Sequence, residues 1–239
     1  MTDFITGEVI LINKPLTWTS FQVVNKMKHL IKKSKGNDFS NSSNNKQQTT
    51  SNKLKIGHAG TLDPLATGLL IVCTGKQTKN IEHYQVQEKE YTGTFYLGAT
   101  TPCFDLEKEI DTYYSTGHIT NELIYTTTKQ FIGKIQQTPP LFSAIKIDGK
   151  RAYDIARAGG TAEIKPKEIT ITTFEITRIA LPEVDFKVTC SKGTYIRSLA
   201  RDFGLALNSG AHLTVLCRTR IGSYKLSDAM NIEEFEKSL

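Results

Sequence analysis

Long apolar runs and the residue pattern of a secretory signal are both missing from this sequence of 239 residues. No stretch approaches the roughly 18 to 20 apolar residues that a membrane-spanning helix requires. The first ten residues, MTDFITGEVI, have no basic segment ahead of an apolar stretch, as a secretory signal would. These absences exclude the usual signs of a membrane or exported protein, and we expect a cytoplasmic protein with no membrane partner.

Closely spaced metal ligands are missing as well. The four cysteines, Cys73, Cys103, Cys190 and Cys217, lie far apart, and the five histidines form no pairs with them. Structural zinc sites need ligands only a few residues apart. We therefore expect neither a disulfide framework nor a metal site. Cys73 and Cys190 lie in apolar or alternating runs, where cysteine usually acts as a small buried hydrophobic residue.

Acidic residues are in the minority, since 30 Lys and Arg face 24 Asp and Glu, for a net charge of +6. Hydrophobic residues make up 38% and charged residues 23%, which is typical of a soluble globular chain. The length predicts a single domain over residues 1–239 with a substantial core. The basic excess favours an anionic partner such as nucleic acid, although charge alone does not decide this.

One segment has a composition unlike the rest. Residues 34–52 consist mainly of Ser, Asn, Gln and Thr, and Phe39 is their only large apolar residue. Such a segment cannot bury enough surface to offset the entropy lost on ordering. It is predicted to be a flexible polar loop.

Hydrophobic patterning elsewhere indicates both strands and helices. Strands are expected at residues 8–12, 69–73, 91–97, 169–179 (with a bulge near Thr173) and 184–190. Helices are expected from an N-cap at Ser20, from an N-cap at Thr120 to about residue 132, and over 196–207 with Gly210 as the stop. Strands mixed with helices, without regular βαβ alternation, predict an α+β fold with a mixed sheet.

The segment KIGHAGTLDPLATG, residues 55–68, presents one carboxylate and one imidazole on a stiff loop. Its glycines permit tight turns, and Pro64 fixes the chain directly after Asp63. Asp-Pro is also a common turn pair, and a loop histidine such as His58 often satisfies only a local hydrogen bond. On these residues alone, the catalytic and the structural interpretation both stay open.

A second segment, CSKGTYIRSLAR at 190–201, reads as a strand end, a turn and a helix start, with Arg197 in the first helical turn. Cations usually avoid this end of a helix because its dipole is positive there. Arg197 therefore indicates a carboxylate or phosphate partner nearby, with a solvated surface arginine as the alternative.

Four motifs in order, GHAGTLDPLATG, KEYTGTFYLG, TPPLFSAIK and CSKGTYIRSLARD, resemble those of the TruB family of tRNA pseudouridine synthases. The resemblance implies the pseudouridine-synthase fold, a mixed and mainly antiparallel sheet flanked by helices with an RNA-gripping insertion. It implies an isomerase that converts uridine 55 in the T arm of tRNA to pseudouridine without cofactor or metal. We also expect a monomer with no obligatory protein partner, and no room before residue 239 for the PUA domain that many family members carry.

The same resemblance assigns roles to individual residues. It implies that Asp63 is catalytic and that Arg197 pairs with it. Substrate-binding roles fall on His58, Tyr91, Tyr195, Leu216 and Lys14. The target base must leave its stack before chemistry, and stacking on an aromatic ring returns about 1–3 kcal/mol per base. Whether Asp63 attacks the sugar, attacks the base or removes a sugar proton stays open.

Basic residues gather in the predicted insertion at about 133–167. They are Lys146, Lys150, Arg151, Arg157, Lys165 and Lys167, and they outnumber the acids of their segment by three. Phosphate neutralisation by such residues would make RNA affinity fall with added salt. The alternative for each of them is an ordinary solvated side chain.

Two other functions are compatible with these motifs. One is a non-catalytic module that opens and refolds tRNA. The other is a catalytic subunit that a guide RNA directs, as in archaeal and eukaryotic relatives of the family. Turnover of a bare tRNA transcript by the chain alone would separate both from a stand-alone enzyme.

Overall fold

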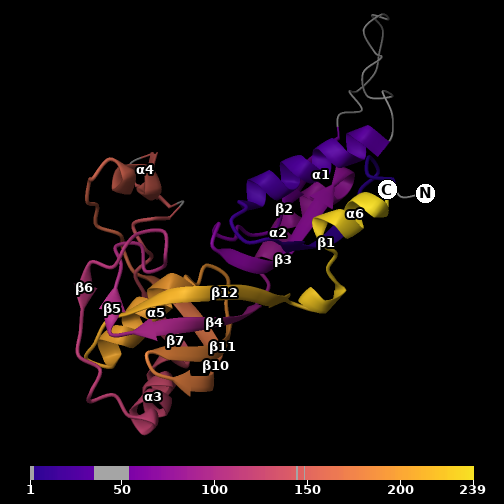
Figure 1. Ribbon diagram of the computed structural model, residues 1–239. Coiled ribbons are helices and arrows are strands. Elements are labelled where there is room, and N and C mark those ends of the chain that lie inside the picture. The colour runs from indigo at the N-terminus through magenta and orange to yellow at the C-terminus, as the bar shows by residue number, and fades with distance from the viewer. Residues whose placement is uncertain (1–2, 35–53, 144, 148) are drawn as a thin grey trace, which may run out of the picture. The chain divides into compact units, whose positions relative to one another are not determined.

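A computed structural model describes residues 3–34, 54–143, 145–147 and 149–239 (Figure 1). The predicted polar loop at 34–52 lies outside the described residues except for Ser34. Contacts divide the chain into two compact units: unit 1 comprises residues 1–87 and 217–239, and unit 2 comprises residues 88–216. The single domain expected from the sequence stays a prediction.

Unit 1 is built on strand β3 (Ala66–Thr74), which pairs antiparallel with β1 (Val9–Lys14) and β2 (Ile56–His58). Because successive side chains on a strand face opposite ways, β3 supplies both faces of the core. Leu70 and Val72 pack with α1 (Ser20–Ser34), while Leu69 and Ile71 join a second cluster on the other face. The remaining elements of this unit are η2 (Gly75–Asn80), α2 (Ile81–Gln85), β13 (Tyr224–Lys225), η4 (Leu226–Asp228) and α6 (Ile232–Lys237).

Unit 2 contains an antiparallel sheet in the order β4 (Lys89–Leu97), β11 (Glu183–Cys190), β10 (Lys167–Ala180) and β7 (Gly133–Gln137). Phenylalanines form its core: the rings of Phe95 and Phe186 stack with centroids 4.1 Å apart, and Phe203 of α5 (Ile196–Ala206) packs on Phe95. The smaller elements are β5 (Ala99–Thr100), β6 (Thr112–Tyr113), α3 (Asn121–Thr128), η3 (Lys129–Phe131), β8 (Lys146–Ile147), β9 (Lys150–Arg151) and α4 (Ala152–Arg157). Strand β12 (Ala211–Ile221) begins in unit 2 and ends in unit 1.

The predicted α+β class is confirmed, and every expected strand is present. The bulge expected near Thr173 is also confirmed, because the register of β10 against β11 shifts between Ile171 and Thr173. Cys73 and Cys190 are buried as expected, and burial raises the pKa of the Cys190 thiol to about 12. Strand β7 occupies the start of the predicted insertion, so only residues 138–166 lie between sheet strands.

Three helix boundaries differ from the prediction. Thr19, not Ser20, caps α1: its hydroxyl accepts from the Gln22 backbone N–H (3.1 Å), and its own N–H donates to the Gln22 side chain (2.7 Å). The helix from Thr120 ends at Thr128 and continues only as a 3₁₀ turn. Helix α5 ends at Ala206, and the chain then turns at Asn208, whose φ is +52°.

Gly210 is therefore not the stop of α5. A Cβ at this position would lie 2.5 Å from the ring of Tyr114, so close packing, and not chain termination, requires glycine there.

Candidate active site

The loop that carries Asp63 is fixed by the segment of unit 1 that begins α1. Ser20, at the start of α1, bonds both polar groups of the Leu62 backbone: its hydroxyl donates to the carbonyl (3.2 Å) and accepts from the N–H (2.9 Å). The carbonyl of Pro64 accepts from the Thr17 N–H at 2.9 Å. The residues on both sides of Asp63 are thus tied to the segment that begins α1, which leaves the half-buried Asp63 side chain little freedom of position.

Lys14 supplies a buried cation beneath this loop. Its side chain is fully buried, and its ammonium donates to the carbonyls of Pro15 (2.8 Å), Trp18 (2.5 Å) and Pro64 (3.3 Å). Burial lowers the pKa of Lys14 to about 8, while the nearby Asp63 carboxylate opposes that shift. At neutral pH the ammonium therefore stays charged and favours the ionised form of Asp63.

Arg218 of β12 is the second buried cation of unit 1. Its Nε donates to the Leu69 carbonyl of β3 (2.8 Å) and its Nη2 to the Gly60 carbonyl of the loop (3.1 Å), so it links the loop to the strand that follows it. Burial, and then the charge of Arg218, lower the pKa of His58 below its usual 6.5. His58 is consequently neutral at pH 7. A neutral imidazole can stack on a base without the free-energy cost of removing a charge from water.

Replacement of Ser20 by alanine should destabilise the protein, because it leaves two buried backbone groups of Leu62 without their partner. The expected loss in the free energy of unfolding is about 1–3 kcal/mol, measured by urea denaturation. Ser227→Ala, which removes an exposed hydroxyl of the same unit, is the matched control. Equal stability of the two variants would contradict the assigned role of Ser20.

The lowered pKa of Lys14 also predicts a pH dependence. Between pH 8 and 10.5 the unfolded chain retains a proton that folded Lys14 has lost. Stability rises with pH wherever the unfolded state binds more protons, so this residue makes the free energy of unfolding increase across that window. Urea denaturation at several pH values should show a smaller increase for Lys14→Met than for the wild type. The exposed-lysine variant Lys32→Met should retain the wild-type dependence, and an unchanged slope in Lys14→Met would refute the prediction.

In unit 2, the end of β7 positions the start of α5. The buried Gln137 accepts from the Tyr195 N–H (2.8 Å) and donates to the Tyr195 carbonyl (3.2 Å). The next residue, Thr138, accepts through its carbonyl from Ser198 (2.9 Å) and Arg201 (3.0 Å). Tyr195 and Arg197 are thereby presented together at a rigid helix start.

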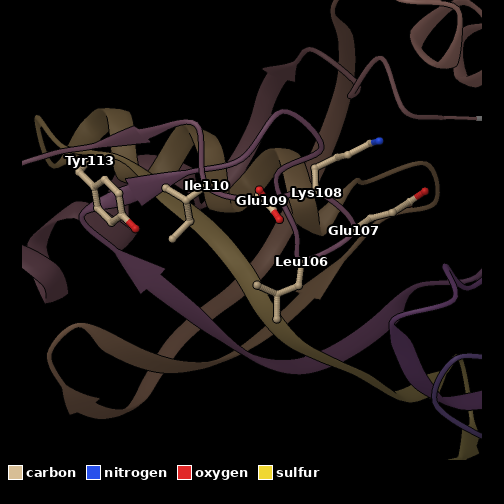
Figure 2. A pocket seen from close by; sticks show the side chains of 6 residues that line it. All are labelled: Leu106, Glu107, Lys108, Glu109, Ile110 and Tyr113. Carbon is tan, nitrogen blue, oxygen red and sulfur yellow. The ribbon is translucent and has the colours of Figure 1, made fainter.

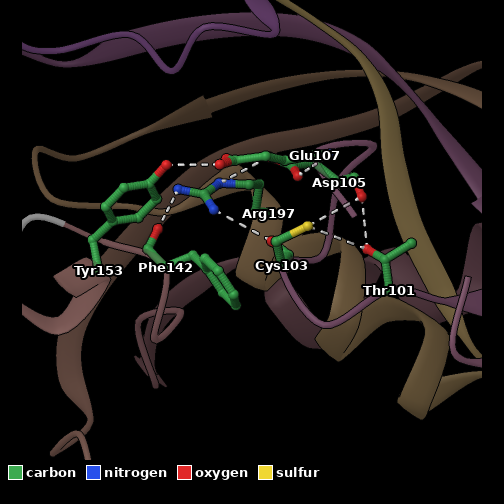
Figure 3. Close-up of polar contacts among 7 residues, drawn as sticks. All are labelled: Thr101, Cys103, Asp105, Glu107, Phe142, Tyr153 and Arg197. Carbon is green, nitrogen blue, oxygen red and sulfur yellow. Dashed lines mark hydrogen bonds and ion pairs between the residues drawn. The ribbon is translucent and has the colours of Figure 1, made fainter. Parts of the chain in front are cut away.

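Arg197 is buried and its guanidinium has a carboxylate beside it (Figure 3). Nη1 donates to the Cys103 carbonyl (3.3 Å), and Nη2 donates to the Phe142 carbonyl (2.9 Å). Nε lies 3.5 Å from Oδ2 of Asp105, and both side chains are at most 7% exposed. The carboxylate that the helix position predicted is thus present, and it is Asp105. Asp63 belongs to unit 1, so its pairing with Arg197 stays a prediction.

Asp105 is itself held by the loop that carries it. Its Oδ1 accepts from the Glu107 N–H (3.0 Å), and its carbonyl accepts from the hydroxyl of Thr101 (2.7 Å) and the thiol of Cys103 (3.4 Å). Burial raises the pKa of the Cys103 thiol, which therefore remains a protonated donor. Contacts within this loop therefore hold the Asp105 carboxylate in place independently of Arg197.

The other predicted substrate-binding residues of unit 2 lie on strands. Tyr91 is on β4, opposite Val188 of β11, and is 9% exposed. Leu216 is half-buried on β12. The structure thus groups Asp63, His58 and Lys14 in unit 1, and places Tyr91, Tyr195, Arg197 and Leu216 in unit 2.

The predicted RNA-binding residues are spread over the insertion. Lys146, Lys150 and Arg151 lie on the short hairpin of β8 and β9, while Lys165 and Lys167 are exposed. Arg157 ends α4; its guanidinium lies 4.4 Å from the ring centroid of Tyr153 and donates to the Tyr153 hydroxyl (2.7 Å). Their contact with RNA stays a prediction.

An open hollow of about 480 Å³ lies on the loop that follows Asp105 (Figure 2). It is lined by Leu106, Glu107, Lys108, Glu109, Ile110 and Tyr113. None of the predicted site residues lines it.

Within the described ranges, no helix is long and apolar enough to cross a membrane. Among those same residues, no group of three or more His, Cys, Asp or Glu is placed to hold a metal ion.

Sequence reasoning missed two residues of this site. Asp105 is one of four acids between 105 and 111, and nothing in that run distinguishes the buried one. Arg218 lies two residues after Leu216 in an alternating strand, where an arginine reads as solvent-facing. A buried arginine that binds carbonyls across a loop depends on tertiary contacts that no local pattern encodes.

Comparison with known proteins gives the family. The model "TruB family pseudouridylate synthase (N terminal domain)" matches residues 46–196, and the model "tRNA pseudouridylate synthase B C-terminal domain" matches residues 197–239. A protein of Flavobacterium johnsoniae named "tRNA pseudouridine synthase B" is 59% identical over 99% of this chain and 98% of its own. A protein of the same name from Phocaeicola vulgatus is 54% identical over 99% and 95%.

Among solved structures, the "Crystal Structure of a Cbf5-Nop10-Gar1 Complex" matches with a TM-score of 0.70 and 28% identity. The match covers 98% of this chain and 54% of the chain in that structure, so this chain spans about half of its length. The family models cover the sequence from residue 46 to its last residue, and the relatives match it almost end to end. The chain belongs to the TruB family of pseudouridylate synthases, and it is an isomerase.

Proposed function

We propose that this chain converts uridine 55 in the T arm of tRNA to pseudouridine, with Asp63 as the catalytic residue. The observation that carries the proposal is the fixed Asp63 loop, whose carboxylate lies near the buried ammonium of Lys14. The nearly full-length relatives named for tRNA supply the substrate class. The choice of uridine 55 rests on the motif resemblance.

The proposed reaction begins with extrusion of the target nucleotide, because a stacked base is out of reach of any side chain. Tyr91 then stacks on the extruded uracil, and neutral His58 fills the space from which it came. The ionised Asp63 carboxylate meets the sugar or the base, and the glycosidic C–N bond breaks. The uracil turns within the site, and its C5 forms the new bond to the sugar. The proton on C5 then leaves, and N1, freed from the sugar, takes up a proton. Product and substrate contain the same atoms, so the overall reaction needs no co-substrate.

Arg197 has a defined part in this scheme. Its guanidinium is held by two carbonyls and by Asp105, which together orient it before substrate arrives. Beside Asp63, it would favour the ionised carboxylate through paired, charge-assisted hydrogen bonds. The basic residues of the insertion would contact phosphates of the RNA arm.

A guide-directed subunit is the second candidate function. The likeness to the Cbf5-Nop10-Gar1 structure favours it, since that protein is found there in a complex. The much higher identity to proteins named "tRNA pseudouridine synthase B" favours a chain that acts directly on tRNA.

One experiment separates these functions. The purified chain is incubated with an unmodified tRNA transcript, and each uridine is tested for conversion. Conversion confined to position 55 is the expected result, and it should become slower as salt is added. Scattered conversion would refute the T-arm specificity, and a requirement for added guide RNA and proteins would favour the second candidate.

A further inference from the structure

Five residues of unit 2 form a closed ring of contacts that includes Arg197 (Figure 3). The Tyr153 hydroxyl donates to Oε1 of Glu107 at 2.7 Å. The Glu107 N–H donates to Oδ1 of Asp105 (3.0 Å), whose other oxygen pairs with Nε of Arg197 (3.5 Å). Nη2 of Arg197 donates to the Phe142 carbonyl (2.9 Å), and the Phe142 ring meets the Tyr153 ring edge-on with centroids 6.0 Å apart. We call these residues the Arg197 ring.

The Arg197 ring joins two segments that are distant in sequence. Asp105 and Glu107 lie on the loop after β5, whereas Phe142 and Tyr153 lie in the insertion. Backbone bonds tie the two insertion residues together, because the Tyr153 N–H donates to the Ser143 carbonyl (2.9 Å) and the Ala152 N–H to the Ile145 carbonyl (2.7 Å). Tyr153 is therefore hydrogen-bonded to the residue that directly follows Phe142, whose carbonyl holds Arg197.

Within the Arg197 ring, only the Tyr153 side chain joins the insertion to the loop of Asp105 and Glu107 by a charge-assisted hydrogen bond. The bond to Glu107 raises the pKa of the Tyr153 phenol, which stays a protonated donor at neutral pH. On its other side the same hydroxyl accepts from Arg157 at 2.7 Å. The neutral phenol thus bridges an anion on the loop and a cation on α4, a helix of the insertion that is predicted to contact RNA.

We infer that Tyr153 is a positioning residue: its bond to Glu107 sets the Phe142 carbonyl and thereby orients the Arg197 guanidinium. This inference rests on the proposed function, in which Arg197 acts next to the target nucleotide. On this inference, the insertion helps to set the catalytic geometry in addition to binding RNA. Tyr153 contacts neither the reacting atoms nor Asp63 in this scheme and acts only through its neighbours.

The test removes one oxygen atom. In Tyr153→Phe the aromatic ring of residue 153 keeps its contact with Phe142, but the hydroxyl's bonds to Glu107 and Arg157 are both lost. The bond to Glu107 alone is lost in Glu107→Ala. Because small misplacements of a catalytic group can cost up to about 10²-fold in rate, we expect the single-turnover rate of pseudouridine formation to fall about tenfold. The dissociation constant for tRNA should change less than about twofold, since no phosphate contact is removed. Tyr125→Phe, at an exposed tyrosine of α3, is the matched control and should behave as the wild type.

Variants of the partner residue sharpen the test. Glu107→Gln keeps an oxygen acceptor and should retain most of the rate, whereas Glu107→Ala should lose as much as Tyr153→Phe. The double variant Tyr153→Phe/Glu107→Ala should be no slower than either single variant, because all three lack the same bond. Multiplicative losses in the double variant would overturn the inference, as would an unchanged rate in Tyr153→Phe. A loss confined to tRNA affinity would overturn it too, because it would indicate a direct RNA contact.

A second readout does not depend on activity. Amide hydrogen exchange in peptides from 101–107 and 141–157 should be faster in Tyr153→Phe than in Tyr125→Phe, since the bond joins these two segments. Unchanged exchange would overturn the inference. A wild-type chain that forms no pseudouridine in tRNA would instead refute the proposed function, so the two failures are distinguishable.

Discussion

Asp63→Asn should abolish pseudouridine formation while leaving tRNA binding nearly intact. The amide has the shape of the carboxylate, so the loop that Ser20 and Lys14 hold should keep its conformation. What is lost is the negative charge and the basic oxygen. Proton transfer by a positioned side chain contributes about 10²–10⁴-fold to a rate, and a nucleophile contributes more. We expect a loss of at least about 10³-fold in single-turnover rate, with the tRNA dissociation constant within about twofold of the wild type.

The control for this variant is Asp228→Asn, which makes the same change of charge at an exposed position of the same unit. It should retain the full rate, and both variants should unfold at similar urea concentrations. Full turnover by Asp63→Asn would remove Asp63 from the chemistry. Loss of tRNA binding in parallel with turnover would show instead that the carboxylate supports the loop and not the reaction.

Elements with a local signal could be predicted from the sequence. The alternation of Val184, Phe186 and Val188 identifies β11, and the helical spacing around Leu199 and Phe203 identifies α5. The motif resemblance marked Asp63 on its loop. These features depend on residues close to one another in the chain, where periodicity and turn chemistry act directly.

Features that depend on distant contacts could not be predicted. Ser20 reads as an N-cap, but its hydroxyl bonds Leu62, 42 residues away, and Thr19 provides the cap instead. Asp105 and Arg197 are 92 positions apart, and neither residue type signals burial. Lys14 and Arg218 are charged residues in strands, yet each is almost fully buried and donates its hydrogen bonds to backbone carbonyls, among them Pro64 for Lys14 and Leu69 for Arg218. The residues that orient the candidate site are therefore the ones that only the structure reveals.

Asp105→Asn should be among the most destabilising substitutions outside the hydrophobic core. It removes the charge that lies 3.5 Å from Arg197 in a region where both side chains are at most 7% exposed. Breaking a buried ion pair by removing one partner costs about 3–5 kcal/mol, because the other charge stays buried without compensation. The two carbonyls that bind Arg197 offset part of this, so we expect a loss of about 3 kcal/mol in the free energy of unfolding, measured by urea denaturation.

A double variant separates stability from catalysis. Replacement of both members of a buried pair by uncharged groups is often nearly neutral, so Asp105→Asn/Arg197→Met should be less destabilised than the sum of the two single variants. It should nevertheless remain inactive, because Arg197 is needed beside the substrate in the proposed reaction. If the stability losses simply add, the two side chains are energetically independent, and the 3.5 Å contact does not position Arg197. If turnover returns with stability, Arg197 has a structural role alone, and the ionised form of Asp63 must then depend on Lys14 within its own unit.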